Sequence, residues 1–177
     1  MFVSGRVASA QDANALQSRL GAVEHVKGVV PRVEVLGRPF CDVADLLGPL
    51  GLSAAQAGRT GPAISVNSPT KTFREGQFLV VEVTAGAGHQ GYLYVGYLDS
   101  SGTWVHMLPS PLHPSNAVAP GQRVVLGAEP AADGTAAQQY EIAPPHGRGM
   151  IVALVSRTPL FERPRPEIET LAELLPA

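Results

Sequence analysis

Between Phe73 and Pro109 the sequence carries a pattern that restricts this chain to one broad class of fold. Apolar and aromatic side chains recur with a period of two in the runs FLVVEVT, GYLYVGYLD and TWVHMLP, which is typical of β-strands with one buried face. The last two runs are joined by Asp99-Ser100-Ser101-Gly102, a four-residue loop of the kind that closes hairpins. The stretch therefore predicts consecutive antiparallel strands.

Further strand-like runs follow towards the end of the chain: QRVVLGA, QQYEIAP and the apolar run MIVALVS. Six strands at regular spacing, with no helix between them, predict an antiparallel β-sandwich of the Ig-like kind. The tail, FERPRPEIETLAELLPA, predicts a short C-terminal helix. Its apolar face would consist of Ile168, Leu171, Leu174 and Leu175. We assign this module, sandwich and helix together, to residues 72–177.

Residues 1–52 predict a small α/β unit of order βαβα. FVSGRVA suits a strand, Ser9 suits the N-cap of a helix, and Leu16, Leu20 and Val23 share the buried stripe of that helix. A second strand, VVPRVEVLGRPF, and a second helix, CDVADLLGPLG, complete the unit. The overall fold class is therefore α+β.

Residues 53–71 have the composition of a linker, rich in Ala, Gly, Ser and Pro. The short run ISV within them could still add an edge strand to the following module. The chain begins close to a predicted strand, which favours a segment of a longer protein over a free-standing small protein.

Charge and cysteine content exclude several classes of partner and fold. Thirteen Lys and Arg against fifteen Asp and Glu give a formal net charge of −2, and the basic residues are scattered, so we expect no nucleic-acid partner. No apolar run approaches the roughly 20 residues of a transmembrane helix, so we expect no direct membrane span. A single cysteine, Cys41, excludes an internal disulfide framework.

We find no catalytic, cofactor or metal motif that fits its required context. Gly86–Gly91 matches the GxGxxG pattern, but the residues after it predict a strand where a dinucleotide site needs a helix. The five histidines lack metal-ligand spacing. Cys41 at a helix start could be a nucleophile or a buried small side chain, and both readings stay open. We therefore expect no enzyme activity, no cofactor and no metal.

The candidate binding residues are Tyr92, Tyr94, Trp104 and His106. Tyr92 and Tyr94 share one face of their strand because side chains alternate, and with Trp104 they could form a stacking surface or belong to the core. His106 alternates with Val105 and Met107, which predicts a surface position.

The order of four segments resembles a widespread bacterial domain of unknown function. The segments are FREGQFLVVEV, YLYVGYLDSSGTWVHMLPS, APGQRVVL and IAPPHGRGMIVALVSRTPLF, and they span Phe73 to Phe161. The resemblance implies a module that follows a serine/threonine kinase or caspase-like domain, some of the kinases being linked to type VI secretion. The segment before it, through RPFCDVADLL, resembles the one that precedes this module in such kinases, and VSGRV and KGVVPRVEVLG resemble BON lipid-associated domains. The family supplies no catalytic residues to carry over.

We therefore expect a non-catalytic interaction or sensory module of a bacterial multidomain signalling protein. It would bind a protein, a peptide or an envelope component, with the parent kinase or caspase-like domain in the same chain. The alternatives are a small-ligand or carbohydrate binder that uses Tyr92, Tyr94 and Trp104, and an assembly piece of a secretion system. A cytoplasmic location and an extracytoplasmic one, beyond a membrane anchor of the parent, both stay open.

Overall fold

The computed structural model describes residues 2–23, 30–48, 61–88, 90–131 and 138–175. The chain divides into two compact units, Met1–Pro49 and Leu50–Ala177. Part of the predicted linker, residues 53–60, lies outside the described residues. The run ISV belongs to an edge strand of the second unit, as anticipated.

The first unit has the predicted βαβα order. Its elements are β1 (Phe2–Val7), α1 (Ala10–Gly21), β2 (Val30–Val35) and α2 (Phe40–Leu47). β1 and β2 pair in parallel, from Phe2 opposite Val30 to Val7 opposite Val35. A parallel pair needs a crossover connection of a dozen or more residues, and the α1 segment supplies it.

Helix α1 begins where the sequence predicts and ends sooner. Ser9 caps it, because the Ser9 hydroxyl accepts a hydrogen bond of 3.1 Å from the backbone N–H of Asp12. The predicted buried stripe is wrong: Leu16 and Leu20 are only half-buried, and Val23 is 52% exposed. The helix ends at Gly21, so Val23 lies beyond the face that α1 turns to the strands.

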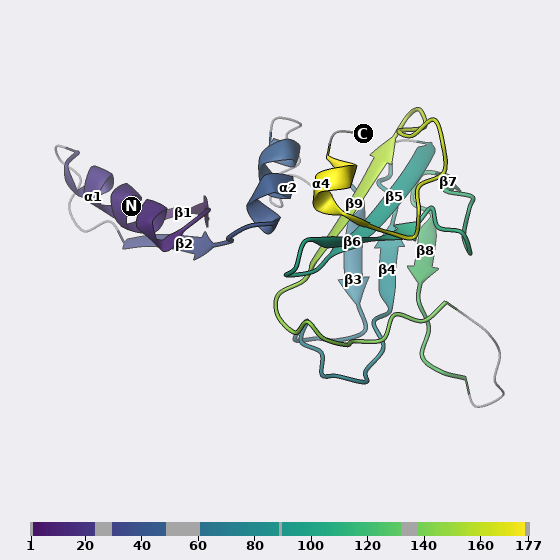
Figure 1. Cartoon of the computed structure of the whole chain (residues 1–177). Coiled ribbons are helices and arrows are strands. Elements are labelled where there is room, and N and C mark those ends of the chain that lie inside the picture. Colours follow the sequence, from purple (N-terminus) through teal and green to yellow (C-terminus); the bar gives the residue numbers. More distant parts are fainter. Residues whose placement is uncertain (1, 24–29, 49–60, 89, 132–137, 176–177) are drawn as a thin grey trace. The chain divides into compact units, whose positions relative to one another are not determined.

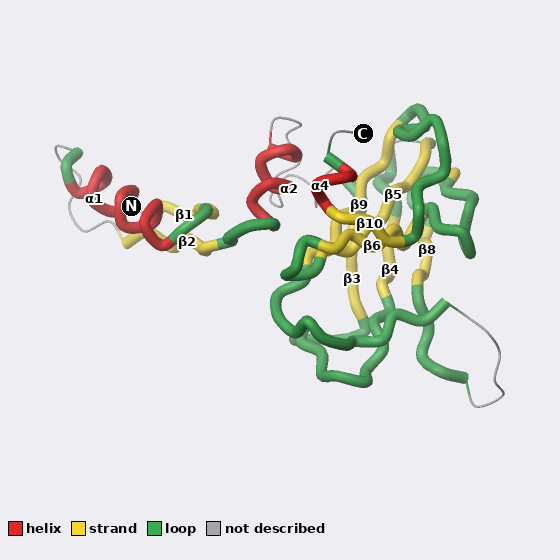
Figure 2. Tube along the Cα trace, viewed as in Figure 1, coloured by secondary structure: helices red, strands yellow, loops and turns green. Residues whose placement is uncertain are grey.

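The second unit consists mostly of strands in two antiparallel sheets (Figures 1 and 2). Its elements are β3 (Ala63–Val66), β4 (Val81–Thr84), β5 (Gly91–Leu98), β6 (Thr103–Leu108), β7 (Ala117–Val118), β8 (Arg123–Leu126), β9 (Met150–Ser156), β10 (Ile168–Thr170) and α4 (Leu171–Leu174). The three-stranded sheet has the order β3-β4-β8. In the five-stranded sheet, β10 pairs with β6, and β6 and β7 pair with different parts of β5. β9 pairs with the opposite edge of β5, from Tyr92 to Leu98.

One hydrophobic core takes side chains from both sheets. Along β5 the buried residues Leu93 and Val95 alternate with the half-buried Tyr92 and Tyr94, as the period of two predicts. The buried core residues are Leu79, Val81, Val83, Ala85, Leu93, Val95, Met107, Leu108, Val118 and Leu126. An α+β fold with antiparallel sheets and a short C-terminal helix is therefore confirmed, while the Ig-like sandwich stays a prediction.

Two predicted elements differ from the structure. The run QQYEIAP forms no named strand, although a bridge joins Phe78 to Glu141 and backbone hydrogen bonds flank it, from Leu79 N–H to the Tyr140 carbonyl and from Ile142 N–H to the Gln77 carbonyl, both at 2.8 Å. Pro144 and Pro145 then have no N–H to continue the ladder. Ile168 lies in strand β10 instead of the C-terminal helix, and it is 59% exposed. The helix starts only at Leu171 because Thr170 and Glu173 form a capping box there.

The β5–β6 hairpin loop is held by one carboxylate. Asp99 Oδ1 accepts hydrogen bonds from the backbone N–H groups of Ser101 (2.8 Å) and Thr103 (2.9 Å) and from the Ser101 hydroxyl (2.6 Å). Burial acts to raise the Asp99 pKa, but these hydrogen bonds outweigh it, so the pKa lies below its usual value.

We expect Asp99→Asn to lower the free energy of unfolding by about 1 kcal/mol at neutral pH. A depressed folded-state pKa stabilises the protein above the unfolded pKa of about 4, and that contribution is lost as the pH falls through the folded value. The difference between the two proteins should therefore shrink between about pH 5 and pH 2. Urea titrations across this range measure it, and a difference that stays constant would contradict the assignment.

Candidate functional site

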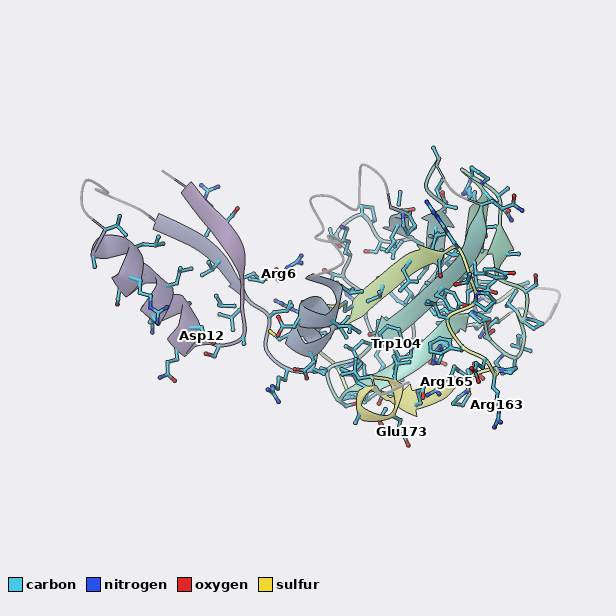
Figure 3. The ribbon with its side chains drawn as sticks, turned by 90° about the horizontal axis from the view of Figure 1, so that it is seen from above. Arg6, Asp12, Trp104, Arg163, Arg165 and Glu173 are labelled. Atoms are coloured by element: carbon cyan, nitrogen blue, oxygen red, sulfur yellow. The ribbon has the colours of Figure 1, made fainter. Side chains whose placement is uncertain are left out.

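The four candidate residues lie on one face of the five-stranded sheet, the face turned away from the core. Tyr92 and Tyr94 alternate on β5 with core residues. On β6, Trp104 lies opposite Leu98 and His106 opposite Gly96, at the same alternate positions. We call this face the outer face, and the chain segment 159–167, which leads into β10, the covering segment. Figure 3 labels Trp104 and, from the covering segment, Arg165.

The outer face is covered, so the predicted surface position of His106 is wrong. His106 is 5% exposed and Trp104 is 8% exposed. The backbone N–H of Leu160 donates a 2.8 Å hydrogen bond to the Tyr94 hydroxyl, and the Phe161 ring meets the Tyr94 ring edge-on at 5.7 Å. Burial by a segment that follows β6 by some fifty residues cannot be read from the alternation within one strand.

A buried polar cluster fixes the covering segment to β6. His106 Nε2 lies 2.5 Å from Glu169 Oε1, and Arg165 donates to both carboxylate oxygens of Glu169, from Nε at 3.1 Å and from Nη2. Burial acts to raise the Glu169 pKa, but the hydrogen bonds from Arg165 and His106 outweigh it and hold the pKa below its usual value. Since the carboxylate is shared between two donors, the cluster serves as a structural link.

The aromatic residues of the outer face are packed against one another. Ring contacts join Trp104 to His106 and His106 to Phe161, both at 6.2 Å, and the Arg165 guanidinium lies 5.6 Å from the Phe161 centroid. In the part of the chain that the structure describes, these ring contacts do not reach Tyr92. The structure thus brings three of the four candidates together, around Phe161, without making Trp104 an exposed stacking platform.

A second feature, which the sequence did not reveal, is a cleft of about 1230 Å³ in the second unit. It is bordered by Ile64 and Val66 of β3 and by Ile168 of β10, and its walls include Tyr97 and Ile151 from the inner face of the five-stranded sheet. Among the described strands, β3 and β10 each pair on one side only. The cleft therefore lies where the edge strands of the two sheets leave the core partly open.

The cleft combines an apolar interior with a nearly balanced charged rim. Ile64 is 39% exposed and Ile168 is 59% exposed, although both are large apolar side chains. The basic lining residues are Lys71, Arg74 and Arg148, and the acidic ones are Glu75, Asp99, Glu141 and Glu167. His146 Nε2 lies 3.1 Å from Glu75 Oε2, which ties one rim segment to the other.

Tyr140 contributes a polar atom to the wall of the cleft. Its hydroxyl is buried and has no hydrogen-bond partner among the described residues. Burial, with a smaller contribution from the charge of Glu167, raises the Tyr140 pKa far above its usual value. The side chain is therefore a neutral donor at any physiological pH.

The remaining candidate motifs, Cys41 and Gly86–Gly91, contribute no described residue to the lining of the cleft. Cys41 is buried in α2, and burial, with Asp45 and Asp42 adding to it, raises the pKa of its thiol, which disfavours a nucleophilic thiolate. After the glycine motif a strand begins at Gly91, as predicted, and His89 of that motif lies outside the described residues. Within the described ranges, no three His, Cys, Asp or Glu side chains are grouped so as to hold a metal.

No helix of the described chain is long and apolar enough to cross a membrane.

A comparison with protein-family models gave a match for part of the second unit. Residues 72–159 match the model named "Domain of unknown function (DUF4384)". Comparisons with curated proteins and with solved structures gave no match. The match takes in β4 to β9, and it ends before the segment that carries Phe161, Arg165 and Glu169. Residues 72–159 are therefore similar to the DUF4384 family, which is described as a domain of unknown function.

Proposed function

We propose that the second unit is a non-catalytic binding module that accepts an extended peptide, or an extended segment of a protein, in the cleft between β3 and β10. The observation that carries the proposal is the combination of a cleft of about 1230 Å³ with two exposed isoleucines, Ile64 and Ile168, on its border. Exposed apolar groups rimmed by polar ones are the usual composition of an interaction site.

The dimensions and charges of the cleft favour a peptide over other ligands. Pockets for small molecules usually measure roughly 300–1000 Å³ and are largely enclosed, whereas this cleft is larger. Three basic lining residues against four acidic ones, with His146 beside Glu75, give no strong local charge. A polyanion such as nucleic acid or a highly phosphorylated segment would find no complementary surface there.

The alternative of a carbohydrate-binding platform receives less support. Such a platform needs exposed aromatic faces, but Trp104 is 8% exposed and Tyr94 is engaged by Phe161. The predicted Ig-like sandwich remains compatible with the shared core of the two sheets. An association with a kinase, a caspase-like domain or type VI secretion rests on the sequence resemblance alone and forms part of the proposal.

Peptide selection on the complete 177-residue chain tests the proposal. We expect display of random peptides to enrich sequences with alternating apolar residues. We expect Ile168→Arg to weaken their binding by about tenfold or more, because a bound peptide would then bury a charged side chain in place of an apolar one. Val125→Arg is the matched control. Val125 is 51% exposed on β8 and lies opposite Glu82, outside the cleft lining, so binding should be unchanged. Fluorescence polarisation gives both affinities.

Two outcomes would contradict this function. One is the absence of any enriched peptide. The other is equal loss of binding in Ile168→Arg and Val125→Arg, which would place the peptide elsewhere. Circular dichroism and thermal unfolding of both variants confirm that the folded state is retained, since both replaced side chains are already largely exposed.

A further inference from the structure

The β3 edge of the cleft carries backbone groups that β4 does not use. β3 and β4 pair in antiparallel register, with Ala63 opposite Thr84 and Ser65 opposite Glu82. The same register extends to Asn67, whose N–H donates a 3.2 Å hydrogen bond to the carbonyl of Val80. In an antiparallel ladder, hydrogen-bonded and non-hydrogen-bonded pairs alternate. Ser65 and Ala63 therefore bond to β4, while the N–H and C=O groups of Ile64 and Val66 point away from it.

The side chains of the same two residues face the inside of the unit. Ile64 lies opposite Val83 and Val66 opposite Val81, and both valines are buried core residues. Among the residues that the structure describes, no strand pairs with the backbone groups of Ile64 and Val66 along this edge, and their apolar side chains lie beside it in the cleft lining. The backbone of an added strand could bond to these N–H and C=O groups, and its side chains could cover the apolar side chains.

The sequence of β3 leaves this edge without the usual protection. Natural edge strands are commonly blocked by charged side chains, proline or bulges. Pro62 precedes β3, but Ala63–Val66 itself is AISV and contains neither a charged residue nor a proline. The β10 edge on the other side of the cleft is different, because Pro164, Pro166 and Glu167 precede it and Glu169 lies within it. Of the two edges, β3 is therefore the one open to strand addition.

We propose that the occupant of the cleft binds as an additional antiparallel or parallel strand on β3, with apolar side chains at alternate positions directed into the cleft. This inference rests on the proposed function. The partner is an extended peptide of low net charge with a period-two apolar pattern. Its backbone bonds to Ile64 and Val66, and its inward side chains contact the apolar cleft wall that includes Ile168. Recognition of this kind takes affinity from the main chain and selectivity from alternate side chains.

The test uses a capped synthetic heptapeptide of alternating threonine and valine, titrated into the complete chain and followed by NMR. We expect the backbone amides of Ile64 and Val66 to shift and to gain protection from hydrogen exchange, with little change at Ser65, whose N–H already bonds to β4. N-methylation of the peptide at single positions should weaken binding by about tenfold at every second residue and leave it unchanged between them, since each lost hydrogen bond leaves a carbonyl unpaired.

On the protein side, Ile64→Pro removes an N–H that the ladder does not use, and proline is tolerated on a strand edge of this kind. We expect this variant to fold and to lose at least about tenfold in affinity. The peptide series keeps the test valid if the variant is unstable.

Methylation effects without a two-residue period, or protection confined to residues outside β3, would overturn strand addition. Peptides found by display that remain sensitive to Ile168→Arg would then still support the proposed function. A dimer of the chain that Ile64→Pro dissolves would instead identify a second copy as the occupant and would overturn the peptide assignment.

Discussion

Replacing Glu169 by alanine is expected to lower the free energy of unfolding by about 3 kcal/mol, the lower end of the range for breaking a buried ion pair. The carboxylate is 8% exposed and receives hydrogen bonds from His106 and from both donor atoms of Arg165. Without it, the buried His106 ring loses this acceptor, while Arg165 retains a 3.4 Å hydrogen bond to the Glu173 carbonyl. The side-chain link between β10 and β6 is lost, and their backbone pairing remains. Urea unfolding followed by the fluorescence of Trp104, the single tryptophan, measures the change directly on the affected face.

The chain contains its own control for this substitution. Glu75 also pairs with a histidine, at 3.1 Å from His146, but the two side chains are 67% and 52% exposed. Glu75→Ala should therefore change the stability by less than about 1 kcal/mol. Glu169→Gln, which keeps the shape and one acceptor oxygen, should recover part of the loss. Similar effects of Glu169→Ala and Glu75→Ala would show that the cluster on the outer face contributes no more than a surface pair.

Gly96→Ala is expected to lower the free energy of unfolding by about 1–3 kcal/mol, the usual range for overpacking a filled site. A Cβ atom built on Gly96 would lie 2.0 Å from Cζ2 and 2.3 Å from Cε2 of Trp104, because the indole ring lies directly against the glycine on the neighbouring strand. The ring is only 8% exposed and is not the free end of a flexible side chain. It would therefore have to leave its position or move the strands apart.

Gly88→Ala is the matched control for Gly96→Ala, because a Cβ at Gly88 would meet no atom within 4 Å. Thermal unfolding of both variants separates the steric effect from the general effect of replacing a glycine. We also expect the Trp104 emission maximum to shift in Gly96→Ala and not in Gly88→Ala. A Gly96→Ala protein with unchanged stability and emission would mean that the indole has room to move aside at little cost.

The fold could be predicted from the sequence wherever a local pattern decides the structure. The runs around β4, β5 and β6 have the period-two alternation of strands, the runs QRVVLGA and MIVALVS are apolar, and each of the five forms a strand. Ser9 predicted the start of α1 for the same reason, since an N-cap depends only on its immediate neighbours. The run QQYEIAP has a similar composition but pairs only over Tyr140–Ile142, because a ladder also depends on a partner strand and on continuous N–H donors.

The candidate site was less accessible to sequence reasoning. Tyr94, Trp104 and His106 were selected because they are polar aromatic residues in strands, and the structure does bring them together. Their burial depends on Phe161 and on Glu169, which lies 63 residues from His106. The cleft depends on the exposed edge of β3, and the only sequence signal for it is an uncharged run, AISV, within a segment of linker composition.

The sequence by itself determined the class of the fold, because alternation of apolar side chains and the capping and turn residues act over a few neighbouring positions. It also excluded a disulfide framework and a basic surface for nucleic acid, since both require residues that the chain does not have in sufficient number. Only the tertiary structure decided which face of β6 is covered and which edge of a sheet stays open. Those outcomes depend on contacts between segments distant in the chain, and no local pattern encodes which segment will arrive to bury a given face.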